Sequence, residues 1–254
     1  RYAGQTLIAV VLLAPRLLHV LRTKHLGLQL LRSTFLFLAT LSFFTSISFM
    51  GLAEATAVMN LNPVLLTLGA AAILGEKLGP LRIIGIAVAL TGALIVIRPG
   101  SEVFSWASLL PLVAGSFYAA YSLTTRFLGR DESVWTSFLY TALIGTLGAS
   151  FLAPSVWIPP SAGDWGLMFL LGCSGATGHI LLIKALTVAE AGLVAPFGYA
   201  GVIFAPIWGM VLFDATPDGA TILGSAIIVA AGIFIWARER AKAKRAVIAA
   251  APPP

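Results

Sequence analysis

Long apolar segments separated by short polar ones run through almost the whole chain. Each is close to the ~20 residues that a helix needs to cross ~30 Å of hydrocarbon. Charged residues, Pro or Gly bound nine such segments, at residues 3–20, 31–52, 55–75, 81–98, 105–126, 133–153, 165–187, 191–213 and 219–237. Continuous apolar runs of this length, without the ten-residue alternation of a membrane strand, are typical of helices. The pattern therefore predicts an all-α polytopic membrane protein.

The composition agrees with a membrane protein. Hydrophobic residues make up 59% of the chain and charged residues only 10%, with a mean hydropathy of +0.96. A soluble domain usually contains about 45–50% apolar residues. The single cysteine, Cys173, cannot form a disulfide within the chain. His19 and His25 have no Cys or carboxylate cluster beside them, so we expect no metal site and no cofactor.

Two segments far apart in the chain are similar. LAEATAVMNLNPVLLTLGAAAILGEKL covers residues 52–78, and VAEAGLVAPFGYAGVIFAPIWGMVLFD covers residues 188–214. Both contain an Ala-Glu-Ala turn at the start, a proline about two turns later (Pro63 and Pro196) and an acid near the end. Proline breaks a helix because it lacks the backbone N–H. Membrane transporters built from two repeats, with the substrate held between them, show this kind of internal symmetry.

Counting segments from the repeated stretch indicates how the chain is divided. The second half holds five predicted spans and the first half four, so we expect one further helix before Arg1 and ten helices in the full protein. An odd number of spans per repeat reverses the orientation of the second, which gives an inverted repeat of two five-helix units. The predicted divisions are a first repeat at 1–100 that lacks its first helix, a second repeat at 101–238 and a basic cytoplasmic tail at 239–254.

The basic residues predict the orientation. Short cytoplasmic loops retain Lys and Arg, and a cytoplasmic C-terminus puts all but Arg1 and Arg98 of the 16 Lys and Arg inside. The inside set is Arg16, Arg22, Lys24, Arg32, Lys77, Arg82, Arg126, Arg130, Lys184, Arg238, Arg240, Lys242, Lys244 and Arg245. Trp157 and Trp165 flank a loop without basic residues, as in an outer aromatic belt. We therefore expect a multi-pass protein of the inner, cytoplasmic membrane, whose basic tail meets anionic lipid and no nucleic acid.

Three stretches resemble a known family. They are LGEKLGPLRIIGIAVALTGALIVIRPG at 74–100, GATGHILLIKAL at 175–186 and APFGYAG at 195–201. In this order they are similar to the EamA-type branch of the drug/metabolite transporter superfamily, and the similarity covers nearly the whole chain. The resemblance implies ten helices in two inverted five-helix repeats with both termini cytoplasmic. It also implies that the spans carrying Asn60, Tyr121, His179 and Tyr199 surround a central cavity.

Polar and aromatic residues inside the spans are the candidate substrate contacts, because polar side chains are costly in a membrane and persist where they face a cavity. Tyr118, Tyr121 and Ser122 share one helix face with Thr125. His179 is the one titratable side chain expected well inside the hydrocarbon region. The full candidate set is Asn60, Tyr118, Tyr121, Ser122, His179, Phe197, Tyr199 and Trp208.

Each candidate also has a purely structural interpretation. His179 can pin two helices together, and Tyr199 and Trp208 can fill a core. Glu76 beside Lys77 is typical of a cytoplasmic turn clamp. Two runs of small residues predict close helix contact, either as an internal frame or as the surface of a homodimer. These runs are Gly85, Ala89 and Ala93, and Gly224, Ala231 and Gly232.

The pattern favours a carrier that moves a small organic solute by alternating access. A membrane-embedded enzyme or flippase for lipid-linked substrates and a structural membrane subunit are the alternatives. The enzyme is disfavoured because no nucleophile–base pair, metal cluster or phosphate-binding Gly loop is visible in the sequence. Protection by ligands from heat separates a carrier from a structural subunit, and turnover of a lipid intermediate identifies an enzyme. Aromatic and hydroxyl groups without an acid in mid-membrane favour a neutral or zwitterionic solute.

The predicted topology can be tested with reporter fusions. A reporter fused after Gly163 is expected on the periplasmic side and one fused after Arg245 on the cytoplasmic side, because basic residues stay inside. The measurement is the activity of a side-specific reporter such as a phosphatase. Two fusions that report the same side would contradict the inverted repeat.

Overall fold

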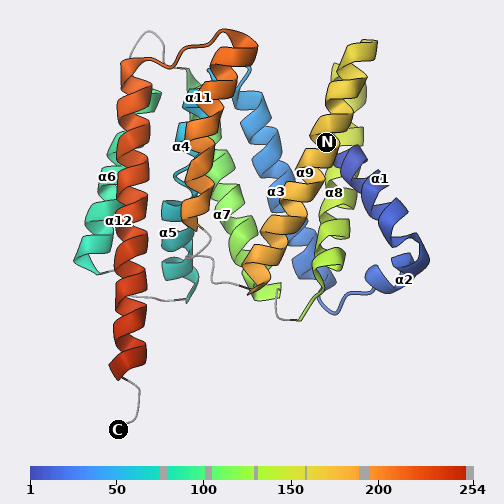
Figure 1. Ribbon diagram of the computed structural model, residues 1–254, viewed down its shortest axis with the longest axis horizontal. Coiled ribbons are helices and arrows are strands. Elements are labelled where there is room, and N and C mark those ends of the chain that lie inside the picture. Colours follow the sequence, from blue (N-terminus) through green and yellow to red (C-terminus); the bar gives the residue numbers. More distant parts are fainter. Residues whose placement is uncertain (75–78, 101–104, 129–130, 158, 189–194, 250–254) are drawn as a thin grey trace. The chain divides into compact units, whose positions relative to one another are not determined.

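The computed structural model describes residues 1–74, 79–100, 105–128, 131–157, 159–188 and 195–249, and their regular structure is helical (Figure 1). The elements are α1 (Tyr2–Leu13), η1 (Ala14–Arg16), α2 (Leu17–Val20), α3 (Leu26–Ser46), α4 (Leu52–Met59), α5 (Asn62–Leu74), α6 (Pro80–Ile97), η2 (Trp106–Leu109), α7 (Leu110–Leu128), α8 (Val134–Val156), α9 (Ala162–Val188), η3 (Ala195–Tyr199), α11 (Ala200–Phe213) and α12 (Gly219–Ala249), where η marks a 3₁₀ helix. The predicted clamp at Glu76 and Lys77, the second Ala-Glu-Ala turn at 189–191 and Arg130 lie outside the described residues.

The helices confirm an all-α polytopic membrane protein. Within the described residues, 8 helical segments are long and apolar enough to cross a membrane. They are Tyr2–Val20, Leu26–Ser46, Leu52–Ile73, Pro80–Ile97, Trp106–Leu128, Val134–Ser155, Ala162–Val188 and Gly219–Arg238. The span predicted at 191–213 corresponds to a shorter apolar helix, Phe197–Phe213.

The helix break predicted at Pro63 is present. Helix α4 ends at Met59 and α5 begins at Asn62, so Pro63 occupies the first turn of the new helix. Proline is tolerated there because its missing N–H has no partner within the helix in any case. In the other copy, Pro196 lies in η3, which leads directly into α11. Both prolines therefore lie where a helix begins.

The chain forms two compact units. Unit 1 comprises Arg1–Leu38 with Ala120–Glu190, and unit 2 comprises Ala39–Ala119 with Ala191–Pro254. Each unit combines segments from both halves of the sequence, and α3 and α7 contribute to both units. The units are thus a different division from the predicted repeats, whose boundaries at 100 and 238 stay a prediction.

Unit 1 packs α1 against α8 and α9. Its apolar core includes Ala9 of α1, Phe138 of α8 and Ile183 of α9. The backbones of α1 and α9 approach closely where two glycines meet: a Cβ on Gly4 would lie 3.2 Å from the Gly172 Cα. Close packing of this kind drives helix association in lipid. Moving an apolar side chain from lipid into a helix interface gains little free energy, because both surroundings are apolar.

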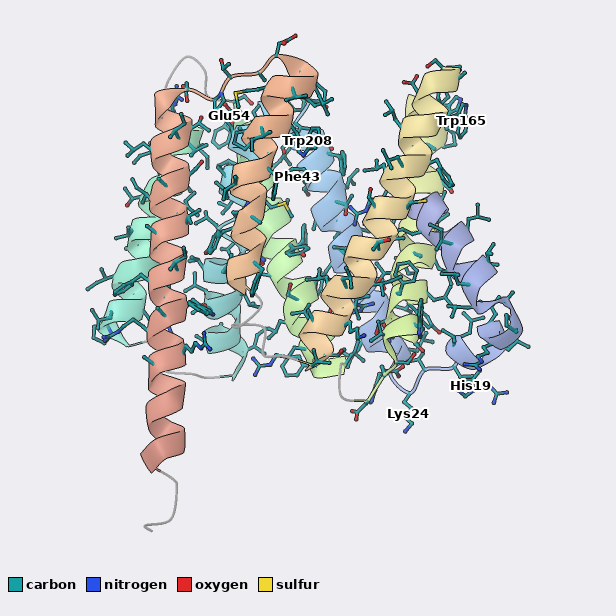
Figure 2. The ribbon with its side chains drawn as sticks, viewed as in Figure 1. His19, Lys24, Phe43, Glu54, Trp165 and Trp208 are labelled. Carbon is teal, nitrogen blue, oxygen red and sulfur yellow. The ribbon has the colours of Figure 1, made fainter. Side chains whose placement is uncertain are left out.

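The two ends of unit 1 differ in character. Figure 2 shows His19 and Lys24 at one end and Trp165 at the opposite end. The end with Lys24 is tied together by Glu132, whose Oε1 accepts from Thr23 Oγ1 at 2.6 Å and from the Lys24 backbone N–H at 2.8 Å. This separation fits the predicted orientation, and the side on which each end lies stays a prediction.

Unit 2 is built around the α6–α12 pair. Gly92 and Gly224 face each other, and a Cβ on Gly224 would lie 2.6 Å from the Gly92 carbonyl oxygen. Ala89 and Ala93 are buried along the same face of α6. The two predicted small-residue faces therefore meet within the chain, which is the internal-frame arrangement.

A salt bridge joins the ends of this helix pair. Arg98 ends α6 with a left-handed φ of 52°, and its guanidinium pairs with the carboxylate of Asp218. Asp218 caps α12 by accepting from the Thr221 backbone N–H at 2.9 Å. Hydrogen bonds from Arg98 and Thr221 lower the pKa of the Asp218 carboxyl to about 2. The carboxylate therefore remains charged well into the acid range.

The Gly92–Gly224 contact predicts a large effect from one methyl group. Gly224→Ala is expected to destabilise the protein by about 1–3 kcal/mol, because the added Cβ overpacks the α6–α12 contact. The measurement is the melting temperature of the purified protein. Gly219→Ala is the matched control, since a Cβ at this α12 position meets nothing within 4 Å. Equal melting temperatures in the two variants would show that the close contact is unimportant.

The Arg98–Asp218 salt bridge predicts a pH-dependent loss of stability. Because the folded-state pKa is lowered, the contribution of Asp218 is complete above about pH 4 and is lost as the pH falls toward 2. Asp218→Asn keeps a capping side chain but removes the charge. Its melting temperature is expected to lie below that of the wild type at pH 7 and to converge with it by pH 2.

Asp214→Asn is the control for this measurement, because Asp214 is exposed and has no ion pair among the described residues. Its difference from the wild type should be small at every pH. A difference for Asp218→Asn that stays constant from pH 7 to 2 would contradict the assigned role of the salt bridge.

Candidate functional site

The candidate site lies in unit 1 and begins with Arg32. Gln29, Arg32, Ser33 and Leu36 follow the i, i+3, i+4, i+7 spacing of one helix face, and all are buried in α3. Arg32 is 0% exposed. Helix α3 begins at Leu26, before the predicted span start at residue 31, so Arg32 lies in the second turn of the helix. Its place on the cytoplasmic side stays a prediction.

The guanidinium of Arg32 contacts hydroxyl and carbonyl groups of α7 and α8. Its Nη1 donates to the Tyr121 hydroxyl at 3.3 Å and to Thr125 Oγ1 at 3.2 Å. Its Nη2 donates to Thr141 Oγ1 at 2.7 Å and to the Ser137 carbonyl oxygen. The Arg32 Cζ lies 5.1 Å from the centroid of the Tyr121 ring, a cation–π distance. Arg32 thus connects α3 with α7 and α8.

Tyr121 of α7 and His179 of α9 meet beside this guanidinium. The Tyr121 hydroxyl lies 3.3 Å from His179 Nε2, and the ring centroids are 5.7 Å apart with a 32° tilt. An arginine has no acceptor, so Tyr121 accepts from Arg32, and its own proton can point to His179 Nε2. The Phe138 ring centroid lies 6.3 Å from that of His179. Two of the predicted site residues are therefore in direct contact.

Several buried polar atoms in unit 1 have no hydrogen-bond partner among the described residues. They are Arg32 Nε, Ser33 Oγ, Gln29 Oε1 and both amide atoms of Gln5. An unsatisfied buried polar group typically costs about 1–3 kcal/mol, so such groups gather where another molecule supplies the partner. Gln5, Gln29 and Arg32 were not singled out from the sequence. The available signal was the polar face at 29, 32 and 33 beside the expected start of a span.

The other candidates on α7 lie on the same side as Tyr121. Ser122 is 5% exposed, and Tyr118 is half-buried. Thr125, whose hydroxyl donates to the Tyr121 carbonyl oxygen at 2.7 Å, is 1% exposed. Most of the predicted stripe of hydroxyl and aromatic groups is thus buried within the protein.

The four remaining candidates, all in unit 2, are in different surroundings. Tyr199 is buried against α12, where its hydroxyl occupies the space that a Cβ on Gly232 would need. Asn60 bonds within its own helix, from Nδ2 to the Thr56 carbonyl oxygen at 2.7 Å. Phe197 is 79% exposed, and Trp208 on α11 is 51% exposed. A substrate-binding role for these four residues stays a prediction.

The residues that the structure describes contain no cluster of three His, Cys, Asp or Glu side chains placed to hold a metal ion. The Tyr121–His179 contact can offer a bound molecule stacking surfaces, hydrogen bonds and a positive charge. Tyr121, His179 and Phe138 supply the rings, and Arg32 supplies the charge.

Comparison with known proteins identifies relatives over most of the chain. The riboflavin transporter of Vibrio cholerae is 31% identical over 248 residues, which cover 95% of this chain and 83% of that protein. The S-adenosylmethionine uptake transporter of Rickettsia prowazekii is 26% identical, covering 87% and 76%. The pseudopaline exporter CntI of Pseudomonas aeruginosa is 28% identical, covering 76% and 69%.

A solved crystal structure shares the fold. It matches 92% of this chain and 83% of its own with a TM-score of 0.63, at 22% sequence identity. The sequence profile of the EamA-like transporter family matches residues 2–98 and 105–237. The chain therefore belongs to the EamA-like transporter family, and the three relatives above are transporters of small solutes.

Proposed function

We propose that this protein carries a neutral or zwitterionic organic solute with a flat ring across the cytoplasmic membrane by alternating access. The observation that carries the proposal is the contact of Tyr121 with His179 inside membrane-spanning helices. Polar groups inside the membrane are energetically unfavourable, and those that occur there commonly line a substrate pathway. Tyr118 and Ser122 extend the same face of α7.

The chemistry of the relatives' solutes supports this proposal. Riboflavin contains a flat ring system, and S-adenosylmethionine combines a purine ring with charged groups of both signs. Rings of this kind stack on tyrosine, histidine and phenylalanine side chains, each pair contributing about 0.5–1.5 kcal/mol beyond area burial. Tyr121, His179 and Phe138 provide such surfaces next to each other.

The proposed contacts are individually weak, as a carrier requires. A neutral hydrogen bond contributes a net 0.5–1.5 kcal/mol, roughly, so no single contact would hold the solute against release. A substrate-binding role for Asn60, Phe197, Tyr199 and Trp208 is part of the same proposal. Alternating access would then expose the bound solute to each side of the membrane in turn.

Transport by the purified protein in lipid vesicles tests the proposal. Riboflavin, S-adenosylmethionine and a panel of ring-containing metabolites would be offered as labelled solutes, with empty vesicles as the control. Accumulation that saturates with concentration supports a carrier. If no solute of the panel enters protein-containing vesicles faster than empty ones, the proposed solute class is wrong.

The Tyr121–His179 pair gives a specific expectation for mutants. Tyr121→Ala and His179→Ala are each expected to reduce transport about fivefold or more, which corresponds to the loss of a contact of ~1 kcal/mol. Tyr121→Phe keeps the ring and should retain more activity than Tyr121→Ala. The measurement is solute uptake normalised to the amount of inserted protein.

Tyr140→Phe is the matched control. Its hydroxyl donates to the Leu21 carbonyl oxygen at 2.9 Å, which is a contact between helices of unit 1 and not part of the candidate site. This variant should lose some heat stability and keep its transport rate. Unchanged transport in both Tyr121→Ala and His179→Ala would identify the pair as packing residues.

A further inference from the structure

We infer that Arg32 binds a negatively charged group of the transported solute, a carboxylate or a phosphate. This inference rests on the proposed transport function and narrows its solutes to those with an acidic group. The starting observation is a guanidinium that is 0% exposed and lies within a membrane-spanning helix. A buried charge of this kind is unfavourable unless an opposite charge accompanies it.

The described carboxylates of unit 1 do not supply that opposite charge. Glu132 accepts hydrogen bonds from Thr23 and the Lys24 backbone. Asp131 lies 3.7 Å from His25 Nε2, and Asp164 accepts from the Ser161 backbone N–H at 2.8 Å. Each therefore has a partner of its own at or beyond a helix end. Among the described residues, Arg32 is stabilised only by hydroxyl groups, a carbonyl group and one aromatic ring.

The hydrogen bonds of Arg32 leave one donor of the guanidinium, the Nε–H, without a partner among the described residues. Nη2 is held firmly by Thr141 and the Ser137 carbonyl oxygen, whereas Nε has no partner. The two contacts of Nη1, at 3.3 and 3.2 Å, are at the long end of the hydrogen-bond range. An anionic oxygen can therefore bind Nε while Nη2 and Nη1 keep the side chain in place. Charge-assisted bonds of this type are shorter and stronger than neutral ones.

The position of Arg32 relates this anion site to the proposed solute. Tyr121 contacts both the guanidinium and His179, so the charge lies next to the proposed stacking surface. If Arg32 only linked helices, a carboxylate of the protein could lie beside it and neutralise its charge without loss of that role. The missing counter-charge is what a solute with an acidic group would provide, since charged residues inside membrane bundles commonly mark substrate pathways.

Matched pairs of compounds test the inference with the purified full chain. Each pair differs in one acidic group: riboflavin 5′-phosphate and riboflavin, S-adenosylmethionine and its decarboxylated form, phenylalanine and phenylalaninamide. Affinity would be measured by protection of the protein from heat over a range of concentrations. The wild type is expected to bind the acidic member of at least one pair about tenfold or more tightly than its partner.

Arg32→Gln is expected to bring this ratio close to one, and Arg32→Lys to leave an intermediate ratio, because lysine keeps the charge without the planar fork. Arg126→Gln is the matched control. It removes one positive charge from α7, next to Thr125, but from an exposed side chain. This variant should keep the wild-type ratio, which separates a local effect from a change in net charge.

The wild-type comparison needs no mutant, so the inference remains testable even if Arg32→Gln does not fold. Equal affinities within every pair, or no binding of any acidic member, would overturn it. A folded Arg32→Gln that keeps the wild-type ratio would overturn it as well. Vesicle uptake is scored separately: a wild type that accumulates riboflavin but shows no preference for acidic partners would refute the anion site and leave the carrier function intact.

Discussion

A charge inside a membrane-spanning bundle is the constraint around which unit 1 is arranged. Because Arg32 is completely buried, its guanidinium requires polar partners that lipid cannot provide. Those partners come from α7 and α8, where Tyr121, Thr125 and Thr141 direct their hydroxyls toward α3. Thr125 and Thr141 each also donate to a carbonyl of their own helix, so they can accept from Arg32 without leaving a proton unsatisfied. Arg32 thus ties α3 to α7 and α8.

Unit 2 is held together differently. Its central pair, α6 and α12, meets through Gly92 and Gly224, where the absence of side chains lets the backbones approach. The same principle places Tyr199 over Gly232, whose missing Cβ leaves room for the phenol ring. Van der Waals packing of this kind depends on shape, so single methyl groups matter at these positions. The contrast fits a frame in unit 2 and a polar recognition surface in unit 1.

Much of the helix content was predictable because an apolar run of about 20 residues has few alternatives in a bilayer. The stripe on α7 and the depth of His179 were also visible, since helical spacing and polarity are local properties. The contact between Tyr121 and His179 was not, because a separation of 58 residues carries no distance information in a single sequence. Arg32 was missed as a site residue because a basic residue at the edge of an apolar run normally marks the cytoplasmic end of a span. Its burial against α7 and α8 depends on contacts between distant segments, which a single sequence does not show.

Tyr121 takes part in both halves of the proposed recognition, because it contacts the charged group of Arg32 and the ring of His179. Its ring lies under the Arg32 guanidinium and beside the His179 ring, and its hydroxyl bonds to both. In the proposed carrier, an acidic group at Arg32 Nε would bind the same guanidinium whose Nη1 contacts the Tyr121 hydroxyl. The charge and the ring of the solute would then be recognised together, so that a compound with only one of them would form only part of the contacts. Selectivity in such a site follows from combining weak contacts, which remain individually reversible during transport.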